Sequence, residues 1–228
     1  AHVTDEKNPF QFIAKKCAQL QAEYHGKTAK KIPVLPEKVD VEFLSDYLTA
    51  RDSFNIPVGV EKNSLEVCYY PFDAGYITLA ASSGTEYLDF EAALIQLLAQ
   101  SLQHKLIVFD TVSALVGSAE EGAIYHSQVK DAESAIDKLF YQIAERNNQY
   151  KEAIENQQEP KAFEPIIIIF NAFSQLRDAI DGVAQEKLAI MLEKGEAKYG
   201  VSILIFDSVK NLQGAAYEKW FKKHVTQA

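Results

Sequence analysis

The sequence predicts a three-layer α/β fold, in which helices cover both faces of a mainly parallel β-sheet. From residue 75 onward, short apolar strands alternate with amphipathic helices, which is typical of parallel sheets. The run from Pro165 to Phe170 is apolar without interruption, as expected for a central strand covered on both faces. Hydrophobic residues make up 47% of the 228 residues and charged residues 24%, which is the composition of an ordinary globular core.

The chain is predicted to begin with an amphipathic helix. Asn8 and Pro9 mark its start, because Asn caps helices and Pro favours the first helical position. Apolar residues then recur at helical spacing until the pattern fades near His25 and Gly26. These apolar residues are Phe10, Ile13, Ala14, Cys17 and Leu20.

A linker follows, punctuated by Pro33 and Pro36. Residues 40–48 fit either a short helix or a short strand. We therefore expect residues 1–55 to be an N-terminal helix and linker that pack on the core, and residues 56–228 to be the main domain.

The main domain opens with extended segments at residues 56–60 and 65–70. Residues 75–80 are a predicted strand and residues 89–102 a predicted helix. The next strand, residues 105–110, is apolar and ends in an acid. A long helix follows, with one apolar face formed by Val129, Ala132, Ile136, Leu139, Phe140 and Ile143, and then a polar loop at 156–165. The next predicted helix contains Leu188, Met191 and Leu192, and a strand follows at 201–207. The last predicted element is an amphipathic helix with Ala216, Tyr217, Trp220 and Phe221.

Composition excludes several classes of function. The formal net charge is −9, which disfavours nucleic acid as a main partner because a phosphate backbone requires a basic face. No apolar run approaches the ~20 residues of a membrane span, and the first residues lack a signal-peptide pattern. Cys17 and Cys68 form no CxxC pair, which indicates a reducing compartment. The five histidines are dispersed without metal-ligand spacing, so we expect no metal site.

The loop between the strand at 75–80 and the helix at 89–102 stands where a Walker A motif, G-x-x-x-x-G-K-[ST], would bind phosphate. On that pattern the two outer glycines become Ala81 and Glu86, the lysine becomes Tyr87 and the hydroxyl residue becomes Leu88. Only an internal position keeps a glycine. The whole loop reads Ala81, Ser82, Ser83, Gly84, Thr85, Glu86, Tyr87 and Leu88.

These replacements remove the chemistry of the motif. Tyr87 has no positive charge for the phosphates, and Leu88 has no oxygen for Mg²⁺. Glu86 places a carboxylate at the helix N-terminus, where an anion would otherwise bind. The same eight residues are equally the pattern of an ordinary strand-to-helix turn that never bound nucleotide, and taken alone they favour that interpretation.

The order of elements from Ile56 to Val225 resembles FtsK/SpoIIIE-type ATPase domains. The resemblance is carried by Ile56-Pro57-Val58-Gly59 before the loop, by Asp110 at the end of the second core strand, and by the stretch from Glu145 to Tyr150. It is most specific for the degenerate third, C-terminal ATPase domain of type VIIb secretion coupling proteins. The resemblance implies a P-loop NTPase-like, RecA-like domain.

The resemblance also places the Walker B acids at Phe170 and Asn171. Neither residue can act as a general base, and Phe170 cannot hold a metal through water. A buried strand with an apolar end gives the same pattern. Either way we expect no catalytic residues in this domain, and weak or absent binding of ATP and Mg²⁺.

Other polar residues have structural and functional interpretations. Asp110 and Asp207 follow apolar strands and should lie at the carboxyl edge of the sheet, where ligands bind in such folds; helix capping or loop hydrogen bonding is the simpler role. Arg146 fits an arginine finger acting on a neighbouring subunit, or a residue that pairs with an acid or the helix dipole. Tyr217, Trp220 and Phe221 fit a partner surface or the core equally well.

The resemblance implies a cytoplasmic domain of a cell-membrane protein whose other domains hydrolyse ATP. Its implied partners are secreted proteins of the WXG100 class and the other ATPase domains of the same protein, arranged in a hexameric ring. The implied role is substrate recognition or regulation of those domains. The alternatives are an active or nucleotide-binding NTPase with an unorthodox site, and a purely structural ring element.

Overall fold

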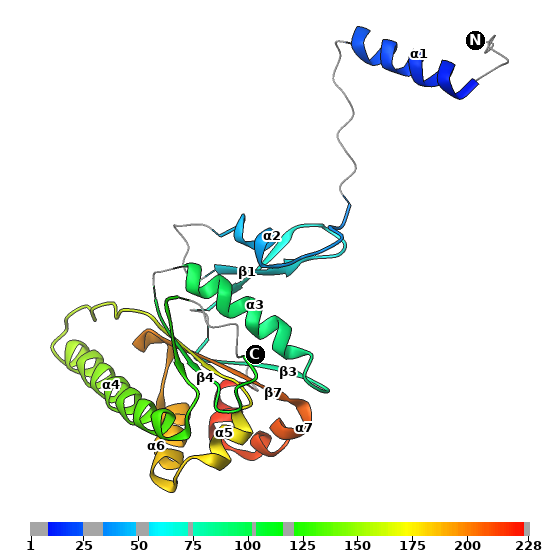
Figure 1. Ribbon diagram of the computed structural model, residues 1–228. Helices are drawn as coiled ribbons and strands as arrows, with labels where there is room; N and C mark the ends of the chain where they lie inside the picture. Colours follow the sequence, from blue (N-terminus) through cyan, green and yellow to red (C-terminus); the bar gives the residue numbers. More distant parts are fainter. Residues whose placement is uncertain are drawn as a thin grey trace. The chain divides into compact units, whose positions relative to one another are not determined.

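The computed structural model describes residues 9–24, 34–48, 55–72, 75–101, 104–115 and 121–225 (Figure 1). The chain divides into two compact units, residues 1–34 and 35–228. In the first unit, helix α1 (Pro9–Glu23) begins at the predicted proline, whereas Asn8 and Gly26 lie outside the described residues. The packing of this helix on the main domain stays a prediction.

The second unit contains a five-stranded parallel sheet with the strand order β3-β7-β6-β4-β5. Strand β6 pairs with β4 on one side and with β7 on the other, and all its residues are buried. The predicted central strand is therefore confirmed. The strands are β3 (Ile77–Ser82), β4 (Lys105–Phe109), β5 (Ala123–His126), β6 (Ile166–Phe170) and β7 (Val201–Ser208).

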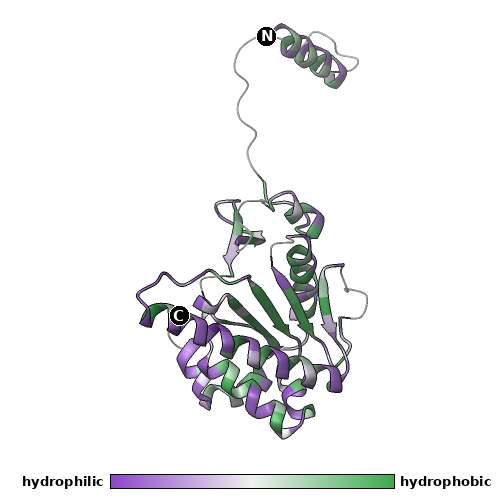
Figure 2. Cartoon of the chain, turned by 90° about the vertical axis from the view of Figure 1, so that its left-hand side faces the viewer, coloured by the Kyte–Doolittle hydropathy of each residue, from purple (hydrophilic) through white to green (hydrophobic). Residues whose placement is uncertain are grey.

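Helices cover both faces of this sheet, so the predicted three-layer α/β fold is confirmed. On one face, helix α3 (Tyr87–Gln100) packs against Leu106, Val108, Ile167, Ile169, Leu204 and Phe206. On the other face, helices α4 (Val129–Glu155), α6 (Gly182–Lys194) and α8 (Lys219–His224) cover Ile107, Phe109, Ile168, Phe170, Ile203 and Ile205. Successive side chains of one strand thus enter different layers, and Figure 2 shows hydrophobic strands behind helices whose outer faces are hydrophilic.

A small antiparallel pair, β1 (Asn55–Val60) and β2 (Val67–Pro71), lies outside the main sheet. Before it comes the short helix α2 (Val41–Ser45), which decides between the two structures open for residues 40–48. The carboxylate of Asp40 accepts the backbone N–H of Phe43 at 3.0 Å, and this capping bond favours the helix.

Two short elements are not predicted from the sequence. Strand β5 has four residues and helix α5 (Phe173–Ala179) has seven, which is too few for a periodic pattern to appear. Short elements also surround strand β7: the turn η1 (Ala197–Tyr199) precedes it and helix α7 (Val209–Leu212) follows it.

The prediction of one final amphipathic helix is wrong. The segment is a 3₁₀ turn, η2 (Gly214–Tyr217), followed by α8. Glu218 between them has extended backbone angles, φ −76° and ψ 150°, so Tyr217 and Trp220 do not share a helix. Among the described residues, no helix combines the length and the apolar character needed to cross a bilayer.

Candidate functional site

The candidate site is the carboxyl edge of the parallel sheet, where the ends of β3, β4, β6 and β7 meet. This is the edge at which open α/β sheets bind ligands. Asp207 lies beside Ala81 in the β3–β7 pairing, and Phe109 lies beside Phe170 in the β4–β6 pairing. The sequence correctly predicts that Asp110 and Asp207 lie at this edge.

In the loop after β3, a carboxylate accepts a hydrogen bond from the loop's own backbone. Glu86 directly precedes α3, and its Oε2 accepts the backbone N–H of Gly84 at 2.9 Å. Hydrogen bonds from its own backbone N–H, from the Ser82 side chain and from Gly84 lower the pKa of Glu86. The exposed Glu86 carboxylate thus binds a backbone N–H of its own loop, next to the start of α3.

The two residues after Glu86 serve packing. Tyr87 and Leu88 are half-buried against the core layer of α3, and the Tyr87 ring lies 6.2 Å from the ring of Phe206. Burial raises the pKa of the Tyr87 hydroxyl, and Asp207, Glu91 and Asp110 raise it further. The lysine position of the motif therefore faces three acids.

Glu91 on α3 is a site residue that sequence reasoning missed. Its side chain is fully buried, and neither carboxylate oxygen has a hydrogen-bond partner. Burial, with a smaller contribution from Asp110, raises the pKa of Glu91 to about 9, so the carboxyl is protonated at neutral pH. The sequence pattern that could have identified Glu91 is its spacing. It lies one helical turn before Leu94 and two before Leu98, on the buried face of an otherwise apolar helix.

The carboxylate of Asp110 accepts hydrogen bonds from the loop that follows it. Its Oδ1 accepts the Ala114 N–H at 3.1 Å, and its Oδ2 accepts the Leu115 N–H at 2.9 Å. The side-chain amide of Asn171 also donates to Asp110, at 2.8 Å, which leaves the buried Oδ1 of Asn171 without a partner. These bonds bring the ends of β4 and β6 together.

Phe170, at the other predicted Walker B position, is completely buried in an aromatic cluster. Its ring stacks on Phe109 at 4.8 Å between centroids and meets Phe173 edge-on at 5.9 Å. Ala172 then turns the chain into α5 with left-handed backbone angles, φ 47° and ψ 50°. The end of strand β6 therefore forms part of the hydrophobic core.

Asp207 also serves its own chain. Its carboxylate accepts the backbone N–H groups of Ser174 at 2.8 Å and Ser208 at 2.7 Å, and the side-chain amide of Asn211 at 2.7 Å. The simpler role expected for Asp110 and Asp207, loop and helix-end hydrogen bonding, is therefore confirmed.

Arg146 lies in a different part of the fold and is nearly buried. It donates to the backbone oxygens of Tyr199 at 2.8 Å and Gly200 at 3.3 Å, and its guanidinium lies 5.3 Å from the centre of the Phe163 ring. Because Gly200 precedes β7, this is the amino edge of the sheet. The described contacts make Arg146 a structural residue, and it binds backbone carbonyls instead of the predicted acid or dipole.

The three aromatic residues of the predicted partner surface have different environments. Tyr217 is 83% exposed, whereas Trp220 is 2% exposed and contacts Phe173 in the core. Phe221 is half-buried beside Trp220. From this position Trp220 cannot offer its ring to a partner, because the break at Glu218 turns it inward. Among the described residues, no group of three His, Cys, Asp or Glu side chains is placed to hold a metal ion.

Comparisons with solved structures show the same fold. EssC (ATPases 2 and 3) from Geobacillus thermodenitrificans superposes with a TM-score of 0.74 and 15% identity over 98% of this chain. Thermomonospora curvata EccC (ATPases 2 and 3), in complex with a signal sequence peptide, gives 0.59 and 18% over 96%. The cytoplasmic domain of the type VII secretion ATPase EccC of T. curvata gives 0.61 and 18% over 96%.

This chain spans only 42%, 41% and 26% of those three chains, in the same order. No protein-family model and no curated protein sequence matches it. The chain therefore has the P-loop NTPase-like fold of the EssC and EccC ATPase domains.

Proposed function

We propose that this chain is a catalytically inactive, FtsK/SpoIIIE-type ATPase domain of a type VII secretion coupling protein. The fold supports the family, and the closed loop supports the loss of catalysis. The single observation that carries the proposal is the Glu86 carboxylate, which accepts the N–H of Gly84 within the loop that we predict to stand in place of a phosphate-binding loop. A triphosphate would have to displace this anion and then lie near the acids Asp110 and Asp207 at the same edge of the sheet.

The proposed loss of catalysis is supported by the replacement of several catalytic groups, each of which matters by itself. Removing even one group that stabilises transition-state charge typically costs ~10²–10³ in rate. Here Tyr87, Leu88, Phe170 and Asn171 replace the lysine, the Mg²⁺-holding hydroxyl and both Walker B residues. We propose that the domain neither hydrolyses ATP nor binds MgATP tightly, and that catalysis belongs to other domains of the full-length protein.

The proposed role is recognition of secreted proteins of the WXG100 class, or regulation of neighbouring ATPase domains in a ring, on the cytoplasmic side of the membrane. The EccC structure that shares this fold was determined with a signal sequence peptide, which supports substrate binding by such domains. The net charge of −9 supports a protein partner over nucleic acid.

Calorimetry and steady-state assays test the loss of catalysis. We expect no heat of MgATP binding and no phosphate release. The double substitution Tyr87→Lys with Leu88→Thr should also be inactive, because Glu86 still fills the loop and the end of β6 still lacks acids. Robust hydrolysis by that variant would show that Phe170 and Asn171 are not the Walker B positions.

Binding of a WXG100-type protein tests the proposed role. Wild-type domain should bind it by calorimetry, with little loss on raising the salt concentration. Tyr217→Ala should leave melting unchanged and reports whether this exposed ring contributes. Trp220→Ala is the folding control, because removing a buried Trp costs about 3–5 kcal/mol. Tight binding of duplex DNA at physiological salt, with no binding of secreted protein, would overturn the proposal.

A further inference from the structure

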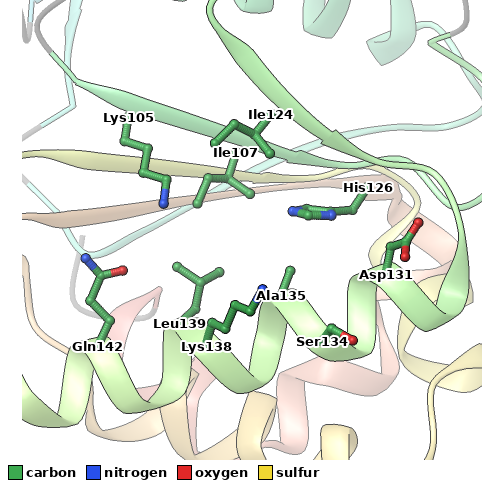
Figure 3. A pocket seen from close by; sticks show the side chains of 10 residues that line it. All are labelled: Lys105, Ile107, Ile124, His126, Asp131, Ser134, Ala135, Lys138, Leu139 and Gln142. Atoms are coloured by element: carbon green, nitrogen blue, oxygen red, sulfur yellow. The ribbon is translucent and has the colours of Figure 1, made fainter.

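Strand β3 forms one border of the main sheet, and its outer side has no partner strand in the described part of the chain. The strand order begins at β3, which pairs with β7 on its inner side. At the opposite border, strand β5 has only four residues and lines a pocket against helix α4 (Figure 3). Because β3 has six residues, it is the longer of the two border strands.

The pairing with β7 determines which backbone groups of β3 point outward. The N–H of Ile203 in β7 donates to the carbonyl of Tyr76 at 2.8 Å, so the backbone of Tyr76 faces β7. Successive residues of a strand direct their N–H and C=O groups to opposite sides, so every second residue, including Ala80, also faces β7. The N–H and C=O groups of Leu79 and Ala81 therefore point away from the sheet.

These outward groups are unpaired. Within the described ranges, the backbone of Leu79 or Ala81 makes no hydrogen bond on this side. Ala81 is exposed and Leu79 half-buried, whereas Ile77, whose backbone points the same way, is buried. Unpaired donors and acceptors along a border strand are a template for another strand.

Strand β3 also lacks the features that usually prevent such pairing. Border strands of soluble proteins are commonly protected by charged side chains, by proline, by bulges or by short length. The sequence of β3 contains no charged residue and no proline, and its register with β7 is continuous. The small β1–β2 pair, by contrast, contains Pro57, Pro71 and a register shift.

We propose that β3 pairs with β3 of a second copy of this chain, antiparallel about a two-fold axis at Ala80. In this register Leu79 of each copy lies opposite Ala81 of the other, and the two residues exchange a pair of N–H···O=C hydrogen bonds. The inference goes beyond the proposed function and does not depend on it, because a two-fold contact closes after two copies and does not build a ring.

The strand is complementary to itself in this register, which is why the proposed occupant is a second copy. Ala80 lies opposite Ala80 at the axis, where antiparallel strands approach to about 4.5 Å between Cα atoms. The large Leu79 lies opposite the small Ala81, and Thr78 lies opposite Ser82. Every pair is uncharged, so two copies of a chain with a net charge of −9 meet here without like charges directly opposite each other.

Sedimentation of the 228-residue chain at increasing concentration tests the dimer. Wild type should pass from monomer to dimer, and added salt should not weaken the dimer, because no ion pair holds it. Ala81→Pro should weaken it by about tenfold or more, since it removes one donor in each copy and thus half of the hydrogen bonds. A wild-type chain that stays monomeric, or a dimer that Ala81→Pro does not weaken, would overturn the proposal.

Ala80→Pro is the matched control for the backbone directions. The N–H of Ala80 faces β7, so this variant should lose a hydrogen bond of the sheet and melt at a lower temperature than wild type. Ala81→Pro keeps every hydrogen bond to β7 and should melt at a temperature much closer to wild type. Equal losses of stability in the two variants would overturn the assignment of the outward groups.

Disulfide cross-linking tests the register without weakening the contact. In a chain whose Cys17 and Cys68 are replaced by serine, Ala80→Cys should form a linked dimer on oxidation, because Cα atoms about 4.5 Å apart lie within disulfide range. Ala81→Cys should link more slowly, although Ala81 is the more exposed residue, because it lies opposite Leu79. Random collision gives the reverse order, and that result would overturn the proposal.

The outcomes also separate this inference from the proposed function. If the chain stays monomeric while wild type and Ala81→Pro bind a WXG100-type protein equally well, the dimer is overturned and the proposed function stands. If it stays monomeric and Ala81→Pro loses that binding, the secreted protein occupies β3 and the second copy is overturned as its partner.

Discussion

The acidic edge of the sheet differs from the groove between strand β5 and helix α4, which is lined by Lys105 and Lys138, in how its charges are satisfied. At the edge, Glu86, Asp110 and Asp207 all accept hydrogen bonds from nearby groups of their own chain. In the groove, Lys105 and Lys138 have no acidic partner among the described residues. The first region uses its polar groups to hold loops in place, whereas the second exposes its two lysines to solvent.

The two regions should therefore respond differently to substitution. A fold can keep the loop geometry of a nucleotide site after its chemistry is gone, because the side chains that fill the site become part of the packing. Substitutions of the buried polar residues at the edge should therefore change stability, and substitutions of the two exposed lysines should change it little. The following predictions test that division at the edge.

The largest effect is expected for Phe170→Asp, which places an acid at the predicted Walker B position. The new carboxylate would lie unpaired between Phe109 and Phe173, so the lost packing and the buried charge should together cost about 5 kcal/mol or more. Chemical denaturation should show little or no folded protein. Phe170→Leu, which keeps the position apolar, should fold. A folded Phe170→Asp domain would mean that the edge retains the capacity of a catalytic site.

Glu91→Gln should stabilise the domain at alkaline pH. The pKa of Glu91 rises from an ordinary value of 4.5 to about 9 on folding, so the unfolded chain loses this proton first as the pH rises. Stability therefore falls between these two values, by up to about 1.4 kcal/mol per pH unit.

The glutamine variant lacks this decline, so its advantage over wild type should grow by about 4 kcal/mol between pH 5 and pH 8. Denaturation curves at both pH values measure the difference, and other titrating groups cancel in the comparison. An advantage that does not change with pH would place the Glu91 carboxylate in a solvated environment.

Asp207→Ala should destabilise the domain by about 2–3 kcal/mol, because it leaves the N–H groups of Ser174 and Ser208 and the amide of Asn211 without an acceptor. Thermal or chemical melting checks this loss. Asp178→Ala is the control: its side chain is 76% exposed, and it should change stability by no more than about 0.5 kcal/mol. Equal effects of the two substitutions would mean that Asp207 is available to a ligand.

The smallest effect is expected for Glu86→Ala. The Glu86 side chain is exposed, so its loss should change melting little, although it frees the N–H of Gly84. MgATP should still fail to bind in calorimetry, because Tyr87 supplies no charge and Asp110 and Asp207 remain. Micromolar MgATP binding by this variant would show that Glu86 alone closes an otherwise working site.

Much of the architecture is encoded locally. The uninterrupted apolar run at Ile166–Phe170 identified the central strand, because only a strand covered on both faces tolerates that pattern. The acids that follow β4 and β7 were placed at one edge, because parallel strands end on the same side. The composition of the loop from Ala81 to Leu88 predicts that the lysine and hydroxyl of a P-loop are missing, and this assignment stays a prediction.

Tertiary structure decided which side chains face each other, and no local pattern contains that information. It brought Glu91 toward Asp110 across α3 and β4, and it turned Trp220 into the core through the extended residue Glu218. It also brought Lys105 of β4 and Lys138 of α4, which is 33 residues further along the chain, into the lining of one groove. Burial and charge pairing depend on neighbours distant in sequence, so they emerge only when the chain is folded.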